Sequence, residues 1–186
     1  MKKLLLIPML ALLFAVMVSC EKDQATTPVV DDQNEMLALR GNAVKPFKGS
    51  YYRDTEPVYM ENPPPGKNII YMFFEGKATH VGNSTFEAVQ TVQFAPFFQI
   101  TGTFVLTAAN GDQFTGHYDV DEYYLDDEGF NNFTGTMYVT PEDNTGRFEG
   151  ITGRLPYYGK HKEPNYGEII LYDGCLDFSG EGCPED

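Results

Sequence analysis

Hydrophobic residues recur at every second position along much of the chain from Pro46 onward. Clusters of Gly, Pro, Asn and Asp separate these alternating runs, and no long run has the 3.6-residue period of a helix. Because alternate side chains of a strand point to opposite faces, the pattern predicts half-buried β-strands joined by turns. In one such run the apolar face carries Phe98, Ile100, Phe104 and Leu106. The length after Pro46 suits one sandwich or barrel with a single core.

A glycine interrupts the apolar face of three successive predicted strands. These glycines are Gly102, Gly116 and Gly135, and each lies between two large apolar residues of the same face. A glycine inside a strand marks a bend or the close approach of another segment, and strands that coil into small barrels need such bends. We therefore predict an all-β fold, a closed and mainly antiparallel barrel of about eight strands. A β-sandwich is the alternative.

The segment Asn68 to Gly76, "NIIYMFFEG", is apolar on both predicted faces. A strand of this kind is usually covered on both sides, either by another segment of the chain or by another subunit. If its outer face is exposed, this strand becomes a candidate oligomer contact.

Two stretches of the chain resemble each other, "ITGTFVLTAANGDQFTG" from Ile100 and "FTGTMYVTPEDNTGRFEG" from Phe133. In both, an Asn is followed four residues later by Phe and two residues after that by Gly. This ordered match indicates two related hairpins, and Asn-Gly in the first copy is a strong turn signal. The motif residues are Asn110, Gly111, Phe114 and Gly116 in the first copy and Asn144, Gly146, Phe148, Gly150 and Gly153 in the second.

The glycines of the second copy have two interpretations. A glycine-rich run ahead of a helix can hold a phosphate group, but no helix-forming run follows this one. The repeat favours a structural role instead. We expect Asn144 to Gly146 to turn the chain, Phe148 to return an aromatic side chain to the core, and Gly150 to bend a strand.

The first residues indicate export and a lipid anchor. Two lysines and an apolar stretch precede Met17-Val18-Ser19-Cys20, and this arrangement is typical of a secretory signal that ends at a cysteine. The last four residues resemble a bacterial lipobox, which implies acylation of Cys20 and cleavage before it; an ordinary signal peptide is the alternative. We predict a signal over residues 1–19, a lipidated Cys20 with a flexible tether over 20–45, and a barrel domain over 46–186.

The charge of the chain is strongly negative, with a formal net charge of -14. Removing the signal would remove two lysines and no acid, which makes the balance more negative still. Nucleic acids and anionic lipid headgroups need clusters of Lys and Arg, so neither is an expected partner. The acidic run "DVDEYYLDDEG" lacks the spacing of an EF-hand loop. We therefore expect no bound metal and no cofactor.

Cys175 and Cys183 bracket a Gly-containing turn near the C-terminus. An exported protein folds in an oxidising compartment, where such a pair can close a small loop and fix the chain end. A disulfide is the preferred prediction, and two free thiols are the alternative.

Three elements in order along the chain, "GKATHVGNSTFEA", "TAANGDQFTG" and "NTGRFEGITG", resemble motifs of exported bacterial proteins with an allene oxide cyclase-like barrel. The resemblance covers roughly Pro46 to Leu171. It implies a closed antiparallel eight-strand barrel related in architecture to dirigent proteins, in a lipoprotein of the Bacteroidota type. The chain departs from the family pattern at Asn144, where Gly is common, and at Ile151, where Ala is usual. The cyclase's catalytic carboxylate and water-holding residues do not map onto a motif here.

Side chains able to do chemistry are sparse and scattered. The catalytic residues are unknown, because neither a zinc-peptidase nor a serine-hydrolase signature is present. His80 and Arg147 are the candidates for polar contacts at the barrel mouth. Each also has a structural interpretation. His80 would bond a neighbouring strand's backbone, and Arg147 would tie down carbonyls or a carboxylate at a barrel end.

These features predict a lipid-anchored protein of the cell envelope, attached to the outer membrane on a face that the sequence leaves undecided. Its function would be to bind a small apolar ligand or a protein partner, or to act as a structural module. An isomerase or cyclase acting at the barrel mouth is the alternative function. The interior decides between them, because eight strands enclose a lumen that side chains fill or that holds one small ligand.

Overall fold

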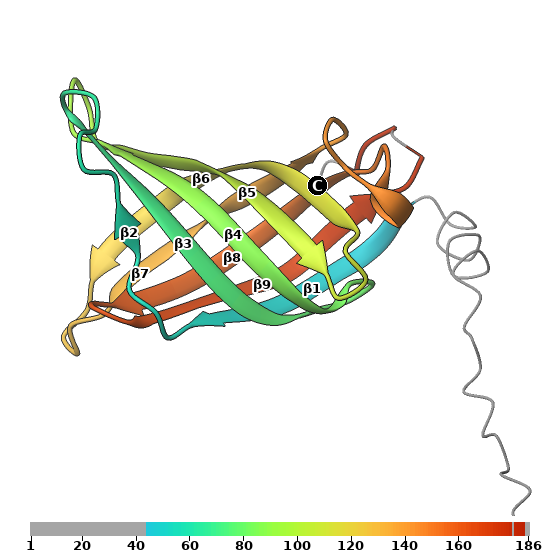
Figure 1. Cartoon of the computed structure of the whole chain (residues 1–186), viewed down its shortest axis with the longest axis horizontal. Helices are drawn as coiled ribbons and strands as arrows, with labels where there is room; N and C mark the ends of the chain where they lie inside the picture. The colour runs from blue at the N-terminus through green and yellow to red at the C-terminus, as the bar shows by residue number, and fades with distance from the viewer. Residues whose placement is uncertain (1–43, 180, 185–186) are drawn as a thin grey trace, which may run out of the picture. The chain divides into compact units, whose positions relative to one another are not determined.

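The computed structural model describes residues 44–179 and 181–184, and these form a closed antiparallel barrel with one additional short strand (Figure 1). The predicted all-β barrel of about eight strands is confirmed. The strands are β1 Val44–Arg53, β2 Val58–Tyr59, β3 Lys67–Ala78, β4 Gly82–Gln93, β5 Gln99–Ala108, β6 Gln113–Leu125, β7 Asn131–Thr140, β8 Thr152–Lys162 and β9 Tyr166–Asp177. The predicted signal, Cys20 and nearly all of the predicted tether lie outside the described residues, and β1 begins at Val44.

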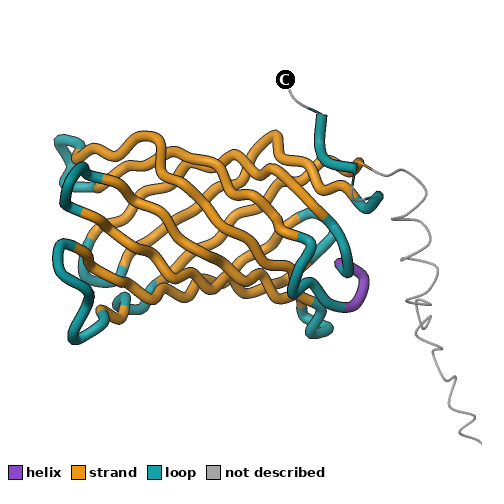
Figure 2. The backbone as a smooth tube through the Cα atoms, turned by 90° about the horizontal axis from the view of Figure 1, so that it is seen from above, coloured by secondary structure: helices purple, strands orange, loops and turns teal. Residues whose placement is uncertain are grey.

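From β3 to β9 each strand pairs with the next, and β1 closes the barrel by pairing with both β9 and β3. The two-residue β2 lies beside β3, where Val58 pairs with Tyr71. We call the end of the barrel with the connections 79–81, 109–112 and 141–151 the closed end. The end with the connections 94–98, 126–130 and 163–165 is the open end. The chain enters β1 at the closed end, which lies at the right of Figure 2.

Aromatic rings fill the half of the lumen next to the closed end. Phe114 is fully buried and packs edge-to-face against Phe47 at 5.9 Å and Phe148 at 5.2 Å between ring centroids. Phe86 and Phe104 stack at 5.6 Å in the next layer. Buried rings of this size dominate the stabilisation of a core, so this half of the lumen is a packed interior.

The inward glycines make room for these and neighbouring rings. A Cβ atom at Gly102 would collide with the ring of Tyr118, and one at Gly135 would collide with the ring of Tyr157 and the backbone of Asp119. The sequence-based prediction of a close approach at these glycines is therefore confirmed. Gly102 and Gly135 thus each leave room for an aromatic ring from the next strand.

The two related hairpins both turn at the closed end, but the second one differs from its predicted form. The first copy turns at Asn110-Gly111, where Gly111 has a φ of +90° and the Gly111 N–H donates to Ala108 O at 2.9 Å. The second connection is longer and contains a 3-10 turn, η1, over Gly146–Phe148 (Figure 2). Phe148 reaches the core as expected. Gly150 does not bend a strand. It lies in the longer connection before β8, with a φ of +76°.

Asn144 holds this longer connection against the barrel. Its side chain is buried, accepts a hydrogen bond from the Thr115 N–H at 2.9 Å, and donates one to Ile151 O at 3.0 Å. Thr145 continues the contact, since its N–H donates to Gln113 O at 2.8 Å. The second copy of the motif is therefore a clamp between the β7–β8 connection and β6.

Two apolar segments differ in position or exposure from what the alternating pattern predicts. Phe98 was expected on the inner face of a strand, but β5 begins at Gln99 and Phe98 is exposed in the preceding loop. On β3, Met72 and Phe74 point inward, whereas Tyr71 and Phe73 on the outer face are each 42% exposed. That outer face is therefore partly open to solvent, and its use as an oligomer contact stays a prediction.

Cys175 in β9 and Cys183 are joined by a disulfide, with 6.2 Å between their Cα atoms. The bond fixes the chain after β9 to the closed end of the barrel. Asp177 adds to this, because its carboxylate accepts hydrogen bonds from Ser179 and from the Gly182 N–H. Among the residues from 44 to 184 that the structure describes, no helix has the length and apolar character needed to cross a membrane.

Candidate functional site

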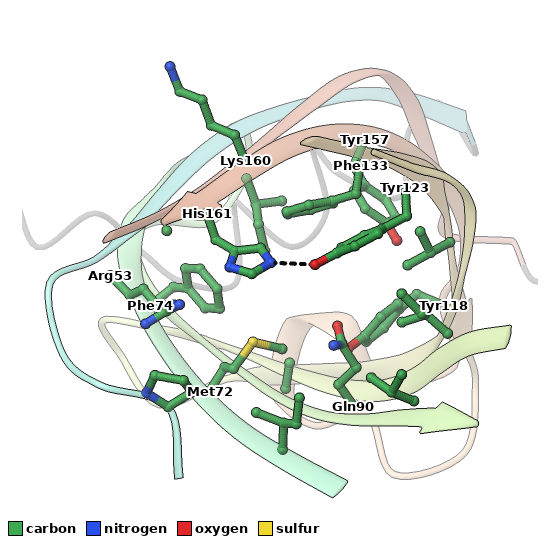
Figure 3. Close-up of a pocket in the computed structure, with 18 of the residues that line it drawn as sticks. Arg53, Met72, Phe74, Gln90, Tyr118, Tyr123, Phe133, Tyr157, Lys160 and His161 are labelled. Carbon is green, nitrogen blue, oxygen red and sulfur yellow. Dashed lines mark hydrogen bonds between the residues drawn. The ribbon is translucent and has the colours of Figure 1, made fainter. Parts of the chain in front are cut away.

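The half of the lumen next to the open end contains a cavity of about 310 Å³ (Figure 3). Its wall is mainly apolar and comes from β3, β4, β5, β6, β7, β8 and β9. The apolar lining residues include Ile70, Met72, Phe74, Ala88, Val92, Ile100, Val120, Phe133 and Met137. The lumen is therefore filled at one end and open at the other.

The sequence explains why the cavity lies at this end. Toward the closed end the inward positions of β4 and β5 carry Phe86 and Phe104, whose rings stack on each other and extend into the lumen. Toward the open end the corresponding inward positions are Val92 and Ile100, which pair directly with each other in the β4–β5 register. Aliphatic side chains of this size do not reach the barrel axis as Phe does, so space remains between the walls.

A line of polar side chains runs across the mouth of the cavity. The Tyr123 hydroxyl lies 3.1 Å from His161 Nε2, and this contact is marked in Figure 3. His161 Nδ1 lies 3.4 Å from a Glu163 carboxylate oxygen, without the alignment of a good hydrogen bond. The same Glu163 oxygen lies 3.6 Å from Arg53 Nη2. Four side chains from β6, β8, the β8–β9 connection and β1 thus form a continuous chain.

The groups around the His161 ring favour one of its tautomers. A carboxylate next to Nδ1 favours the tautomer with the proton on Nδ1, which leaves the Nε2 lone pair for the Tyr123 hydroxyl proton. Burial is the main effect that lowers the pKa of His161 below 6.5, partly opposed by Glu163. Burial likewise raises the pKa of Tyr123 above 10.0, with smaller contributions from Glu163 and Tyr59. Both shifts keep the Tyr123–His161 pair uncharged near neutral pH.

Tyr123 reaches the mouth because of a β-bulge in β6. The pairing of β6 with β7 shifts by one residue between Val120 and Glu122. Without this shift, simple alternation from Phe114 and Tyr118 would turn Glu122 inward and Tyr123 outward. The extra residue turns Tyr123 to the inner face opposite Phe133. The identity of an inward side chain at the mouth is thus set by a backbone irregularity.

Arg53 is the most deeply buried charged group at the mouth, with its side chain 2% exposed. Its guanidinium donates to Thr55 O at 2.8 Å and to Pro164 O at 3.2 Å, and it faces Glu163. Its stem lies across Gly167, where any Cβ would collide with it. Arg53 therefore joins β1 to the β8–β9 connection as well as lining the cavity.

Deeper in the cavity the principal hydrogen-bonding group is Gln90 on β4 (Figure 3). Tyr118, from β6, donates its hydroxyl proton to Gln90 Oε1 at 3.4 Å. The hydroxyl of Tyr157, at the floor of the cavity, is already bonded to Asp119 O at 3.0 Å. In the described part of the chain the Gln90 amide nitrogen has no protein partner, so it can donate a hydrogen bond into the cavity.

Apolar side chains surround the opening. Phe94, Phe97 and Phe98, in and beside the β4–β5 connection, are each more than half exposed. Phe98 contacts the ring of Tyr123 at 6.4 Å between centroids, which ties this loop to the mouth. Phe94 and Phe98 also line the cavity. The entrance is therefore apolar on one side and polar on the other.

The two side chains predicted for the mouth lie at the closed end instead. His80 sits in the β3–β4 turn with a φ of +63°, and its Nε2 donates to Pro46 O at 3.1 Å. Arg147 lies 3.6 Å from Asp112, donates to Val81 O at 3.5 Å, and covers the Phe148 ring at 4.9 Å. Both match the structural interpretation that the sequence left open. Neither lines the cavity, because their turns lie at the other end of the strands.

The residues that do line the mouth carry little signal in the sequence. His161 and Glu163 lie at the end of β8 and just after it, and Arg53 lies more than a hundred residues away at the end of β1. Antiparallel closure of the barrel brings these strand ends together. Within residues 44–179 and 181–184, no three His, Cys, Asp or Glu side chains are grouped to hold a metal ion.

Comparisons of the chain with models of protein families, with curated protein sequences and with solved structures found no match.

Proposed function

We propose that this protein is a lipid-anchored binding protein of the cell envelope that holds a small, largely apolar ligand in the open half of its barrel. One observation carries the proposal: the lumen is packed with rings at the closed end and contains an apolar cavity of about 310 Å³ at the open end. Ligand sites are concave and mostly apolar, with volumes of about 300–1,000 Å³ and a few oriented polar groups. The closed eight-strand barrel also supports the proposed kinship with allene oxide cyclase-like exported proteins.

The energetics favour a modest affinity. Transfer of apolar surface from water gains about 25 cal/mol per Å², but association costs several kcal/mol of lost translational and rotational freedom. A ligand that fills this cavity should therefore bind with a dissociation constant of about 1–100 µM. The barrel needs no rearrangement to accept it, because the cavity is already formed.

A titration with a neutral apolar fluorophore, N-phenyl-1-naphthylamine, tests the proposal. We expect saturable fluorescence enhancement with the wild-type protein. Val92→Trp places a large side chain into the cavity and should weaken binding at least tenfold. Val89→Trp is the matched control, because Val89 lies on the same strand but on the outer face and should leave binding unchanged. Equal affinities for all three proteins would contradict the lumen as the binding site.

The proposed lipid anchor would attach to the chain ahead of β1. The chain enters the barrel at the closed end through Val44, so the opening lies at the end away from the N-terminal attachment. With Cys20 lipidated, the tether over residues 20–45 would link the barrel to a membrane, and we propose that this is the outer membrane. Cys20→Ala should release the protein into the soluble fraction after cell lysis. A variant that stays in the membrane fraction would refute the lipid anchor.

A second function is favoured by the Tyr123–His161–Glu163 chain. Its geometry resembles an acid–base relay, in which a carboxylate orients an imidazole that accepts a hydroxyl proton. With a β,γ-unsaturated ketone, Tyr123 Oη would take the α-proton while its own proton moves to His161 Nε2. Tyr123 Oη would then give a proton to the γ-carbon and take its own proton back from His161 Nε2, which completes the isomerisation and restores both side chains. The pKa shifts of Tyr123 and His161 both oppose this proton transfer, so we rank this function below binding.

The isomerase function predicts deuterium uptake during conversion of such a ketone in D₂O, above the rate in buffer. Tyr123→Phe should abolish the excess rate while keeping the binding of N-phenyl-1-naphthylamine. If protein and buffer give the same rate, the mouth does not act as a catalytic site on this class of substrate.

A further inference from the structure

The charged groups around the cavity are matched in pairs. Arg53 faces Glu163 at 3.6 Å, and Lys160 lies 3.8 Å from Glu168. The Lys160 side chain points away from the cavity (Figure 3), so the Arg53–Glu163 pair is the one that borders it. A charged ligand group would have to compete with one member of this pair for the other. Burying an ionised group without a partner costs several kcal/mol.

The protein surface near the mouth adds to this effect for anions. Asp121, Glu122 and the acidic residues of the 126–130 connection lie at the open end, and the whole chain carries a formal net charge of -14. A negative field of this kind lowers the local concentration of anionic ligands and slows their association. A cation would be attracted to the surface, but inside the cavity Glu163 is already occupied by Arg53.

An uncharged polar group, in contrast, finds a partner inside. Gln90 projects from β4 between the apolar positions Ala88 and Val92, and its amide nitrogen is left to donate. In this orientation the Gln90 amide nitrogen needs an acceptor, which the oxygen of an alcohol, ketone or ester supplies. A ligand oxygen placed against Gln90 and Tyr118 would be hydrogen-bonded while the rest of the ligand contacts aliphatic and aromatic walls.

The geometry points to an uncharged ligand, mostly hydrocarbon with one hydrogen-bonding oxygen, such as an alcohol, ketone or ester, recognised inside the barrel by Gln90. This inference rests on the proposed function and narrows it. It disfavours free fatty acids and aliphatic amines as occupants. Gln90 acts as a specificity residue, and the Arg53–Glu163 pair acts as the barrier to ions.

Competition against bound N-phenyl-1-naphthylamine tests the inference with four probes of equal chain length: decanol, 2-decanone, decanoate and decylammonium. We expect decanol and 2-decanone to displace the fluorophore at least tenfold better than either ion. Gln90→Leu should weaken both neutral probes about threefold to tenfold relative to the fluorophore, in line with one lost hydrogen bond, with the fluorophore affinity of each variant measured by direct titration. Gln93→Leu is the control, because Gln93 alternates to the outer face.

The outcomes separate the two levels of the proposal. If neither the fluorophore nor any of the four probes binds, the binding function itself fails. If the fluorophore binds but decanoate or decylammonium competes as well as decanol, the cavity does not discriminate against charged ligands, and this inference is wrong. If Gln90→Leu leaves the decanol affinity unchanged, Gln90 is not the recognition residue.

Discussion

Asn144 shows how a single polar residue secures an irregular connection. Its side chain satisfies two backbone groups at once, the Thr115 N–H and the Ile151 carbonyl, in a buried position. Removing it leaves both groups without partners away from water, and each such loss costs about 1–3 kcal/mol.

Asn144→Ala should therefore lower the free energy of unfolding by about 2–6 kcal/mol, measured by urea denaturation. Asn83→Ala is the control, because Asn83 is exposed and should change stability by less than about 0.5 kcal/mol. Equal effects of the two substitutions would show that the Asn144 clamp contributes nothing specific.

His161 should make stability depend on pH. Its pKa in the folded protein is lowered below 6.5, mainly by burial. The unfolded chain then binds more protons in the window between the lowered pKa and 6.5, so stability falls as the pH decreases through that window. Above about pH 6.5 this contribution is complete and constant.

His161→Gln should therefore flatten the decrease in Tm between about pH 7.5 and pH 5 relative to wild type. His117→Gln should keep the wild-type pH dependence, because His117 is exposed on the outer face. A His161→Gln profile that parallels the wild-type curve would argue against a buried neutral imidazole at the mouth.

At the scale of the elements, the inward glycines and the rings across them form complementary pairs. Gly102 and Tyr118 lie opposite each other in the β5–β6 register, and any side chain at Gly102 overlaps the Tyr118 ring. Gly102→Ala should destabilise the barrel by about 1–3 kcal/mol through overpacking. The cost should shrink when Tyr118 is also changed to Leu, which a double-mutant cycle measures.

Thr103→Ala is the control for this cycle, since Thr103 is exposed on the same strand. If Gly102→Ala has the same cost in the presence and absence of Tyr118, the two residues are not coupled. That result would remove the packing explanation for the glycine in the middle of β5.

Local pattern was sufficient to predict the strands and their inward glycines, because alternation and close approach are properties of neighbouring residues. The local pattern was insufficient to predict which side chains line the mouth of the cavity. Tyr123 faces inward only because of the bulge between Val120 and Glu122, and such a shift leaves no mark in the hydrophobic pattern. The contact of Arg53 with Glu163 depends on closure between β1 and β9, which joins residues distant in the chain. His80 and Arg147 were conspicuous in the sequence because they belong to turn motifs, and turns hold structural side chains too.

At the scale of the whole molecule, the two ends of the barrel serve different roles. The closed end receives the chain at β1, carries the disulfide and contains the packed rings, so it supplies stability. The open end contains the cavity, the apolar β4–β5 connection with Phe94 and Phe98, and the polar side chains from Tyr123 to Arg53. Separation of this kind lets the cavity stay empty without loss of the fold, since the core beneath it is complete.

The most direct test of ligand binding in the open half of the barrel is NMR of methyl-labelled protein with decanol. We predict intermolecular NOEs from decanol to the methyl groups of Ile70, Met72, Val92, Ile100 and Val120, which line the cavity. Methyl groups in the packed half, such as those of Leu155 and Leu176, should show none. NOEs confined to the outward-facing Val89, or the absence of any NOE at saturating decanol, would contradict the account.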